Sequence, residues 1–250
     1  MTTPIKEIPQ LVEDLRRCYR KKERTLNDRK KQLRGVLRLI EVSSFCFFRV
    51  VEYENVTFLR RADIFKNVQE NTSDFVTALK KDLNRHPSFT KKVLGGCVRA
   101  TQLAIDNLSK WSRARVHDPV GENKAEVRMS PRGLVLIIGT WNFPCPLVLK
   151  PLVSAIAAGN CVVIKLSEIS SNTSSLLAKL LGRYLDRDVV RVVQGAIPES
   201  TALLRCRFDL IFYTGNTNVV SFTFVFTMFP RRSPVSQESH FHTHYCRDES

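Results

Sequence analysis

The sequence predicts an α/β protein in which N-terminal helices precede a partial doubly wound parallel sheet of the Rossmann type. The clearest observation is segment 133–168, where two apolar runs, at 134–138 and 161–165, flank a helical pattern at 147–158. Uninterrupted runs of branched apolar residues are typical of parallel strands covered on both faces. Gly159 and Asn160 follow the helical pattern as a C-cap pair. Segment 133–168 therefore predicts one β-α-β unit.

The remaining elements are expected on both sides of this unit. Ser170 to Asn172 are expected to cap a helix with Leu176, Leu177, Leu180, Leu181 and Tyr184 at core spacing. Further strands are predicted at 189–193 and 210–213, and a short helix at 201–206. Upstream, helices are predicted at 75–83 and 93–111, with an apolar side made of Val98, Leu103, Ile105, Leu108 and Trp111.

The N-terminal 40 residues carry much of the chain's net charge of +15, with twelve Lys and Arg against five Asp and Glu. Leu11, Leu15, Leu26, Leu33, Val36, Leu37 and Ile40 recur near helical spacing, which predicts an amphipathic helix with a basic face. That face could contact an acidic membrane surface or nucleic acid. No nucleic-acid-binding signature accompanies it, so a solvated face on a helix packed against the sheet domain is favoured.

Composition shifts divide the chain into four parts: a helical region at 1–112, a polar connection at 113–132, a partial dinucleotide-binding domain at 133–217 and a tail at 218–250. Segment 43–64 interrupts the helical region with a β-prone patch, which is either a lineage-specific hairpin or a mis-joined gene model. The tail is expected to be disordered, and its His240, His242 and His244 would suit a metal only on a strand. Seven cysteines without metal or redox spacing, and no signal peptide, favour an intracellular protein, cytoplasmic or membrane-associated.

Several ordered motifs resemble the NAD(P)-dependent aldehyde dehydrogenase family, most of all its class 3, fatty-aldehyde branch. They are Gly-Thr-Trp-Asn-Phe-Pro at 139–144, Ala-Ile-Ala-Ala-Gly-Asn at 155–160 and Val-Ile-Lys-Leu-Ser-Glu at 163–168. The likeness continues through Tyr184-Leu-Asp, Val192-Val-Gln-Gly and Phe208-Asp to Tyr213-Thr-Gly215, so that it covers roughly 66–217. Many ordered motifs over one unit are far more specific than a single glycine motif.

The resemblance implies roles for individual residues and a nicotinamide cofactor, NAD or NADP. Asn142 is similar to the family's oxyanion-hole asparagine, whose amide donates to the substrate oxygen as that oxygen gains charge. Lys165 and Glu168 resemble the pair that holds the adenosine ribose, an ammonium donor and a carboxylate acceptor. Thr140, Trp141, Phe143 and Pro144 would line the nicotinamide end, and Gly215 would belong to the phosphate turn. The family usually has proline where this chain has Leu166, which makes that turn less rigid.

Departures from the family pattern decide the expected activity. After Gly215 the glycines expected beneath the pyrophosphate are replaced by asparagine and valine, which approach a phosphate less closely. The family's general-base motif and nucleophilic cysteine are absent from the sequence. Cys145 lies three residues from Asn142, but as a lone thiol without a base it is favoured as an apolar filler.

We therefore expect a family member whose complete relatives oxidise aldehydes, of the fatty class, and which is truncated before the catalytic domain and inactive alone. The alternative is a non-catalytic protein that binds nucleotide or docks to a full-length relative. Expected partners are an aldehyde substrate and a second copy or a full-length relative. A membrane surface remains open, and nucleic acid is disfavoured.

Overall fold

A computed structural model describes residues 2–40, 70–120 and 123–215 of the 250-residue chain. Its centre is a four-stranded parallel sheet in the order β5-β4-β3-β6. The strands are β3 (Leu134–Ile138), β4 (Cys161–Lys165), β5 (Val190–Val193) and β6 (Leu210–Tyr213). The predicted α/β class and the parallel sheet are confirmed, and three of the four strands have the predicted bounds.

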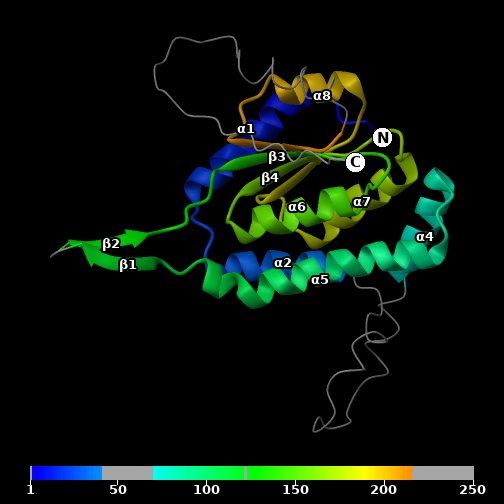
Figure 1. Ribbon diagram of the computed structural model, residues 1–250. Helices are drawn as coiled ribbons and strands as arrows, with labels where there is room; N and C mark the ends of the chain where they lie inside the picture. The colour runs from blue at the N-terminus through cyan, green and yellow to red at the C-terminus, as the bar shows by residue number, and fades with distance from the viewer. Residues whose placement is uncertain (1, 41–69, 121–122, 216–250) are drawn as a thin grey trace, which may run out of the picture.

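Helices cover the sheet on both faces (Figure 1). One face carries α1 (Ile8–Lys21) and α8 (Ile197–Leu204), and the other carries α6 (Pro146–Ala157) and α7 (Ser171–Tyr184). Outside α6 and α7 lies a further layer made of α2 (Leu26–Ile40), α4 (Glu70–Leu83) and α5 (Pro87–Trp111). Alternate residues of β3 enter the two cores, since Leu134 and Leu136 pack with α1 and α8 whereas Val135 and Ile137 pack with α6.

The single amphipathic helix expected at the N-terminus is wrong, because the segment forms two helices: α1 packs on one face of the sheet, and α2 lies on the other side, in the layer outside α6 and α7. A short 3-10 turn (Ile5–Glu7) leads into α1, and α1 ends where Lys22 becomes extended. Thr25 then caps α2: its Oγ1 accepts from the amide of Asp28, and the Asp28 carboxylate accepts from the amide of Thr25. This reciprocal cap is a sequence signal for a new helix start that the spacing of leucines obscured. Leu26 is consequently exposed, not part of the core.

One expectation about a helix face and one about a helix start also need correction. Leu103 and Trp111 of α5 are 58% and 44% exposed, whereas Leu108 is buried as expected, together with Leu94, Cys97 and Ala104. Helix α8 begins at Ile197, not at 201, because Pro198 favours the first turn.

The N-terminus of α7 is capped by a residue from another helix. Asp82 of α4 accepts from the amides of Asn172 and Thr173 at 3.1 and 2.7 Å, and also from the Asn172 side chain. Ser170, which the sequence suggested as part of the cap, has a buried Oγ that finds no hydrogen-bond partner among the described residues. These bonds to Asp82 outweigh the effect of its burial and hold the pKa of its carboxyl below the usual range.

The polar connection contains an antiparallel hairpin of β1 (Arg115–Val120) and β2 (Asn123–Val127), which projects away from the body of the protein (Figure 1). The unusual segment 43–64 and the tail with its three histidines lie outside the described residues. Within the described ranges, no helix combines the length and apolar character needed to cross a bilayer. The same ranges hold no cluster of three or more His, Cys, Asp or Glu suited to a metal ion.

Replacement of Asp82 by alanine should lower the free energy of unfolding by about 1–2 kcal/mol at pH 7, because two α7 amides lose their acceptor. A carboxyl with a lowered folded-state pKa stabilises above its unfolded pKa and loses that effect as the pH falls. The difference between Asp82→Ala and the wild type should therefore shrink below about pH 4. Urea unfolding at several pH values measures it, with the exposed Asp74→Ala on α4 as control. Equal effects of the two substitutions would contradict the cap.

Candidate nucleotide and aldehyde site

The carboxyl ends of the four parallel strands meet at one edge of the sheet. The register pairs Ile138 with Lys165 and with Tyr213, and Lys165 with Val193, so the four strands end level with one another. Ligands of open α/β sheets bind outside this edge. Every residue that the sequence suggested for cofactor or substrate either ends one of these strands, as Lys165 does, or follows one.

Lys165 and Glu168 form an ion pair at the end of β4. The Lys165 ammonium lies 2.8 Å from a carboxylate oxygen of Glu168, and the Lys165 side chain is 5% exposed whereas that of Glu168 is 43% exposed. Partial burial alone would raise the pKa of Glu168, but the hydrogen bond from Lys165 outweighs it and lowers the pKa. The pair thus presents a fixed carboxylate acceptor to solvent, with a buried ammonium that retains further N–H donors.

The turn after β3 approaches β4 closely. The Gly139 amide donates to the carbonyl of Lys165 at 2.8 Å, and a Cβ at Gly139 would lie 2.6 Å from the Val148 side chain. Only glycine fits there. The next residue, Thr140, has a buried Oγ1 with no partner among the described protein atoms. A buried hydroxyl left unpaired one residue after the Gly139–Lys165 contact is available to a polar ligand, as a nucleotide would require at this edge.

Asn142 is exposed on the same turn. Its Oδ1 accepts from the Phe143 amide at 3.0 Å, which leaves the NH₂ group to donate to a ligand. Trp141 and Phe143 flank it and are 49% and 38% exposed, while Pro144 is buried. Beside this turn lies a shallow pocket that Leu79, Leu83 and Phe89 of the α4–α5 region complete. The contribution of α4 and α5 is not visible in the sequence, because it arises only from tertiary contact.

Cys145 is fully buried at the start of α6, and burial strongly raises the pKa of its thiol. A reactive cysteine needs an accessible thiolate, and Cys145 has neither the exposure nor the pKa. Its interpretation as an apolar filler is consistent with this position.

Gly215 follows β6 at the same edge and is the last residue that the structure describes. The residues expected beneath the pyrophosphate come after it and lie outside the described part of the chain. The role of Gly215 therefore stays a prediction.

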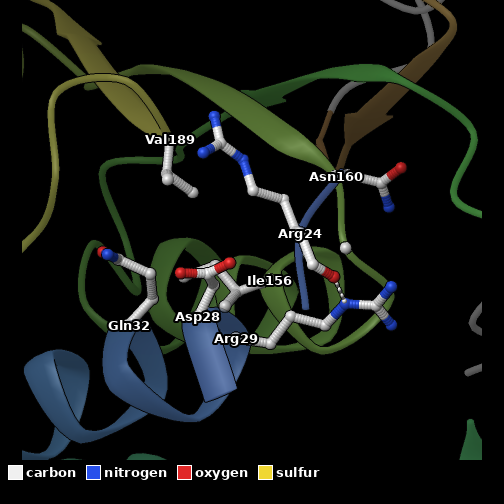
Figure 2. Close-up of a pocket in the computed structure, with 8 residues that line it drawn as sticks. Arg24, Asp28, Arg29, Gln32, Ile156, Asn160 and Val189 are labelled. Atoms are coloured by element: carbon white, nitrogen blue, oxygen red, sulfur yellow. Dashed lines mark hydrogen bonds between the residues drawn. The ribbon is translucent and has the colours of Figure 1, made fainter. Parts of the chain in front are cut away.

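A second pocket lies at the opposite, amino-terminal edge of the sheet, where Asn160 precedes β4 and Val189 precedes β5 (Figure 2). Arg29 donates from Nε to the carbonyl of Arg24 at 2.9 Å, and Arg24 donates to the carbonyl of Asp188 at 2.8 Å. These arginines join α2 to the ends of α6 and β5. Their contacts make the pocket a structural junction, far along the strands from Lys165.

A sequence model described as the aldehyde dehydrogenase family matches residues 48–222. The chain belongs to the aldehyde dehydrogenase family. Among its relatives, aldehyde dehydrogenase family 3 member A2 of Macaca fascicularis is 44% identical over 163 residues, which are 61% of this chain and 32% of the relative. The dimeric NADP-preferring aldehyde dehydrogenase of Canis lupus familiaris is 40% identical over 157 residues, 61% of this chain and 34% of the relative.

The solved structure of Staphylococcus aureus AldH in a substrate-bound state superposes with a TM-score of 0.74 at 25% identity, over 92% of this chain and 44% of that one. The aldehyde dehydrogenase fold and the class 3 relationship are thereby confirmed. The chain spans about a third of the length of the curated relatives it matches.

Cys145 should resist alkylation in the folded protein. Burial also raises the pKa of Cys97 to about 11, whereas Cys18 and Cys206 are only partly buried. Iodoacetamide treatment followed by mass spectrometry should show Cys145 and Cys97 modified at least tenfold more slowly than Cys18 and Cys206, because attack needs an accessible thiolate. In urea that unfolds the protein, the alkylation rates of the four cysteines should converge. Fast native labelling of Cys145 would contradict the buried position.

Proposed function

We propose that this chain forms the nucleotide-holding part of an NAD(P)-dependent oxidoreductase that oxidises aldehydes to carboxylic acids. The observation that carries the proposal is the Lys165–Glu168 pair at the end of β4, next to the unpaired Thr140 hydroxyl and the Gly139 turn. A carboxylate at this place accepts from the two ribose hydroxyls, while the ammonium donates to one of their oxygens.

When bound, the cofactor supplies the hydride acceptor of the reaction. The exposed rings of Trp141 and Phe143 would shield the nicotinamide end of the cofactor from water. The Asn142 amide would donate to the aldehyde oxygen as charge develops on it. Loss of one such donor raises the activation barrier by roughly 3 kcal/mol.

No described residue at this edge supplies the thiolate or the general base of such a reaction. Cys145 is enclosed, and the acidic residue of the site, Glu168, is paired with Lys165. The seven-cysteine sequence also lacks the family's nucleophile and base motifs. We infer that the 250-residue chain alone binds nucleotide weakly and has no turnover.

A second candidate function, docking to a full-length relative or to a second copy, is favoured by the edge strand β6. In the described part of the sheet, β6 has a neighbour on one side alone. Its Leu210 and Phe212 are 37% and 39% exposed on the face where α6 covers β3 and β4. An open edge with apolar side chains favours pairing with another chain.

We expect the protein inside the cell, in the cytoplasm or at a membrane surface. The five cysteines that the structure describes are all free thiols, as a reducing compartment favours. A membrane contact would use the exposed cations of the N-terminal helices.

NAD should bind to the purified chain with a dissociation constant in the millimolar range, or about −4 kcal/mol. Glu168→Gln should weaken NAD binding about fivefold, because the ribose loses its charged acceptor. Relative to NAD, NADP should bind better to Glu168→Gln than to the wild type, since the carboxylate no longer repels a 2′-phosphate. Ligand-observed NMR titration measures both, with the exposed Glu13→Gln on α1 as control. Low-micromolar binding that Glu168→Gln leaves unchanged would place the nucleotide elsewhere.

The chain alone should show no NAD(P)-dependent oxidation of hexanal or longer aldehydes, because the enclosed Cys145 cannot attack the carbonyl. NADH absorbance should rise no faster than in buffer with cofactor and aldehyde. Turnover that disappears in Cys145→Ala would overturn this expectation and make Cys145 the nucleophile.

A further inference from the structure

Helices α2 and α5 form an outward face on the layer that lies farthest from the sheet. The two helices pack side by side, outside α6 and α7 (Figure 1). Lys30 of α2 donates to the Ser109 hydroxyl of α5 at 3.2 Å, so the start of α2 lies beside the end of α5. The helices are therefore antiparallel, and the residues opposite their buried stripes point away from the body of the protein.

Exposed cations recur along this outward face, which we call the basic face. They are Lys31, Arg34 and Arg38 of α2 and Arg99 and Lys110 of α5. Their spacing keeps each set on one side of its helix. None of these cations forms an ion pair with a described residue. Asp106 also lies on the exposed side of α5 and accepts from the Gln102 side chain at 2.7 Å. Five cations with one carboxylate give the face a positive potential.

Large apolar side chains accompany these cations. Leu103 is 58% exposed and lies between Arg99 and Lys110 on the same side of α5. Trp111, at the end of the helix, is 44% exposed at the border of the face. Cations combined with exposed leucine and tryptophan are typical of helices that lie in the surface of a bilayer, where the apolar side chains reach the boundary between head groups and acyl chains.

We propose that the basic face binds the surface of a bilayer that contains anionic lipids. The proposal rests on the membrane location proposed above, and it names the face and the lipid class. The lysine and arginine side chains donate to the lipid phosphate and carboxylate groups, while Leu103 and Trp111 enter the boundary beneath the head groups. Each cation near such a surface contributes about fivefold in affinity. A nucleic acid would meet the same charges, but it offers no apolar surroundings to Leu103.

Sedimentation of the full 250-residue chain with lipid vesicles tests the proposal. Vesicles of phosphatidylcholine mixed with phosphatidylserine should bind the wild type about tenfold or more tightly than vesicles of phosphatidylcholine alone. Binding to the mixed vesicles should weaken as the salt concentration rises, because a shorter Debye length screens the attraction.

Variants decide whether the basic face is responsible. Arg34→Gln with Arg38→Gln should weaken binding to the mixed vesicles about twentyfold. The matched control, Lys6→Gln with Arg205→Gln, removes the same charge from exposed positions on the α1 and α8 side and should cost less than about twofold. Leu103→Ser keeps the charge and should weaken binding about threefold. Thermal melting identifies loss of folding, in which case the single substitutions carry the comparison.

Equal binding of the wild type to the two kinds of vesicle, or equal losses in the two double variants, would overturn the proposal. Tighter binding to single-stranded DNA than to the mixed vesicles, unchanged by Leu103→Ser, would assign the basic face to nucleic acid instead. These measurements use neither nucleotide nor aldehyde. Failure of NAD to bind at Lys165 and Glu168 would therefore count against the proposed oxidoreductase and not against the basic face.

Discussion

The burial of β3 on both faces is the constraint on which the rest of the structure depends. Leu134 and Leu136 are enclosed by α1 and α8, while Val135 and Ile137 are enclosed by α6, so the strand requires a helical layer on each side. Its parallel pairing with β4 and β6 then brings the Gly139 turn and Lys165 to one edge. Because the candidate site lies at the strand ends, its geometry depends more on the packing of β3 than on the turns that follow the strands.

The N-terminal segment contributes a helix to each side of the sheet, α1 directly on one face and α2 outside α6 and α7 on the other, and a partly buried ion pair fixes α1. Arg16 of α1 donates to Asp209 at 3.0 Å, and the same carboxylate oxygen accepts from the Leu134 amide at 2.7 Å. A Cβ at Gly133 would lie 2.4 Å from that oxygen. One carboxylate thus joins α1 to the start of β3 and β6. Removal of one partner of such a pair is expected to destabilise more than the intact pair stabilises.

Local patterns predicted the sheet because each strand is a contiguous apolar run, and the bounds of β3, β4 and β6 agree with those expected. Local patterns failed where a residue distant in the chain determines the local structure. The α7 cap comes from Asp82, 90 residues away in the chain, and the single N-terminal helix was wrong because the Thr25–Asp28 cap overrides the leucine spacing. At the site, Lys165 and Glu168 are three residues apart, so the sequence alone could predict that they form a pair. The approach of Arg85 to the Phe143 ring could not be predicted in this way, since it exists only after α4 and α5 have packed.

The exposure of the site explains why binding groups alone would not make this chain a catalyst. Around the same edge Trp141, Ile169 and Ile197 are 49%, 62% and 74% exposed, and Glu168 is also open to water. A donor such as the Asn142 amide stabilises a developing oxyanion mainly in a site from which water is excluded. Exposed apolar side chains at a ligand-binding edge form a surface suited to cover by another protein surface. A soluble thiol added to the isolated chain would therefore stand in for the nucleophile without restoring the low-dielectric surroundings that the proposed role of Asn142 requires.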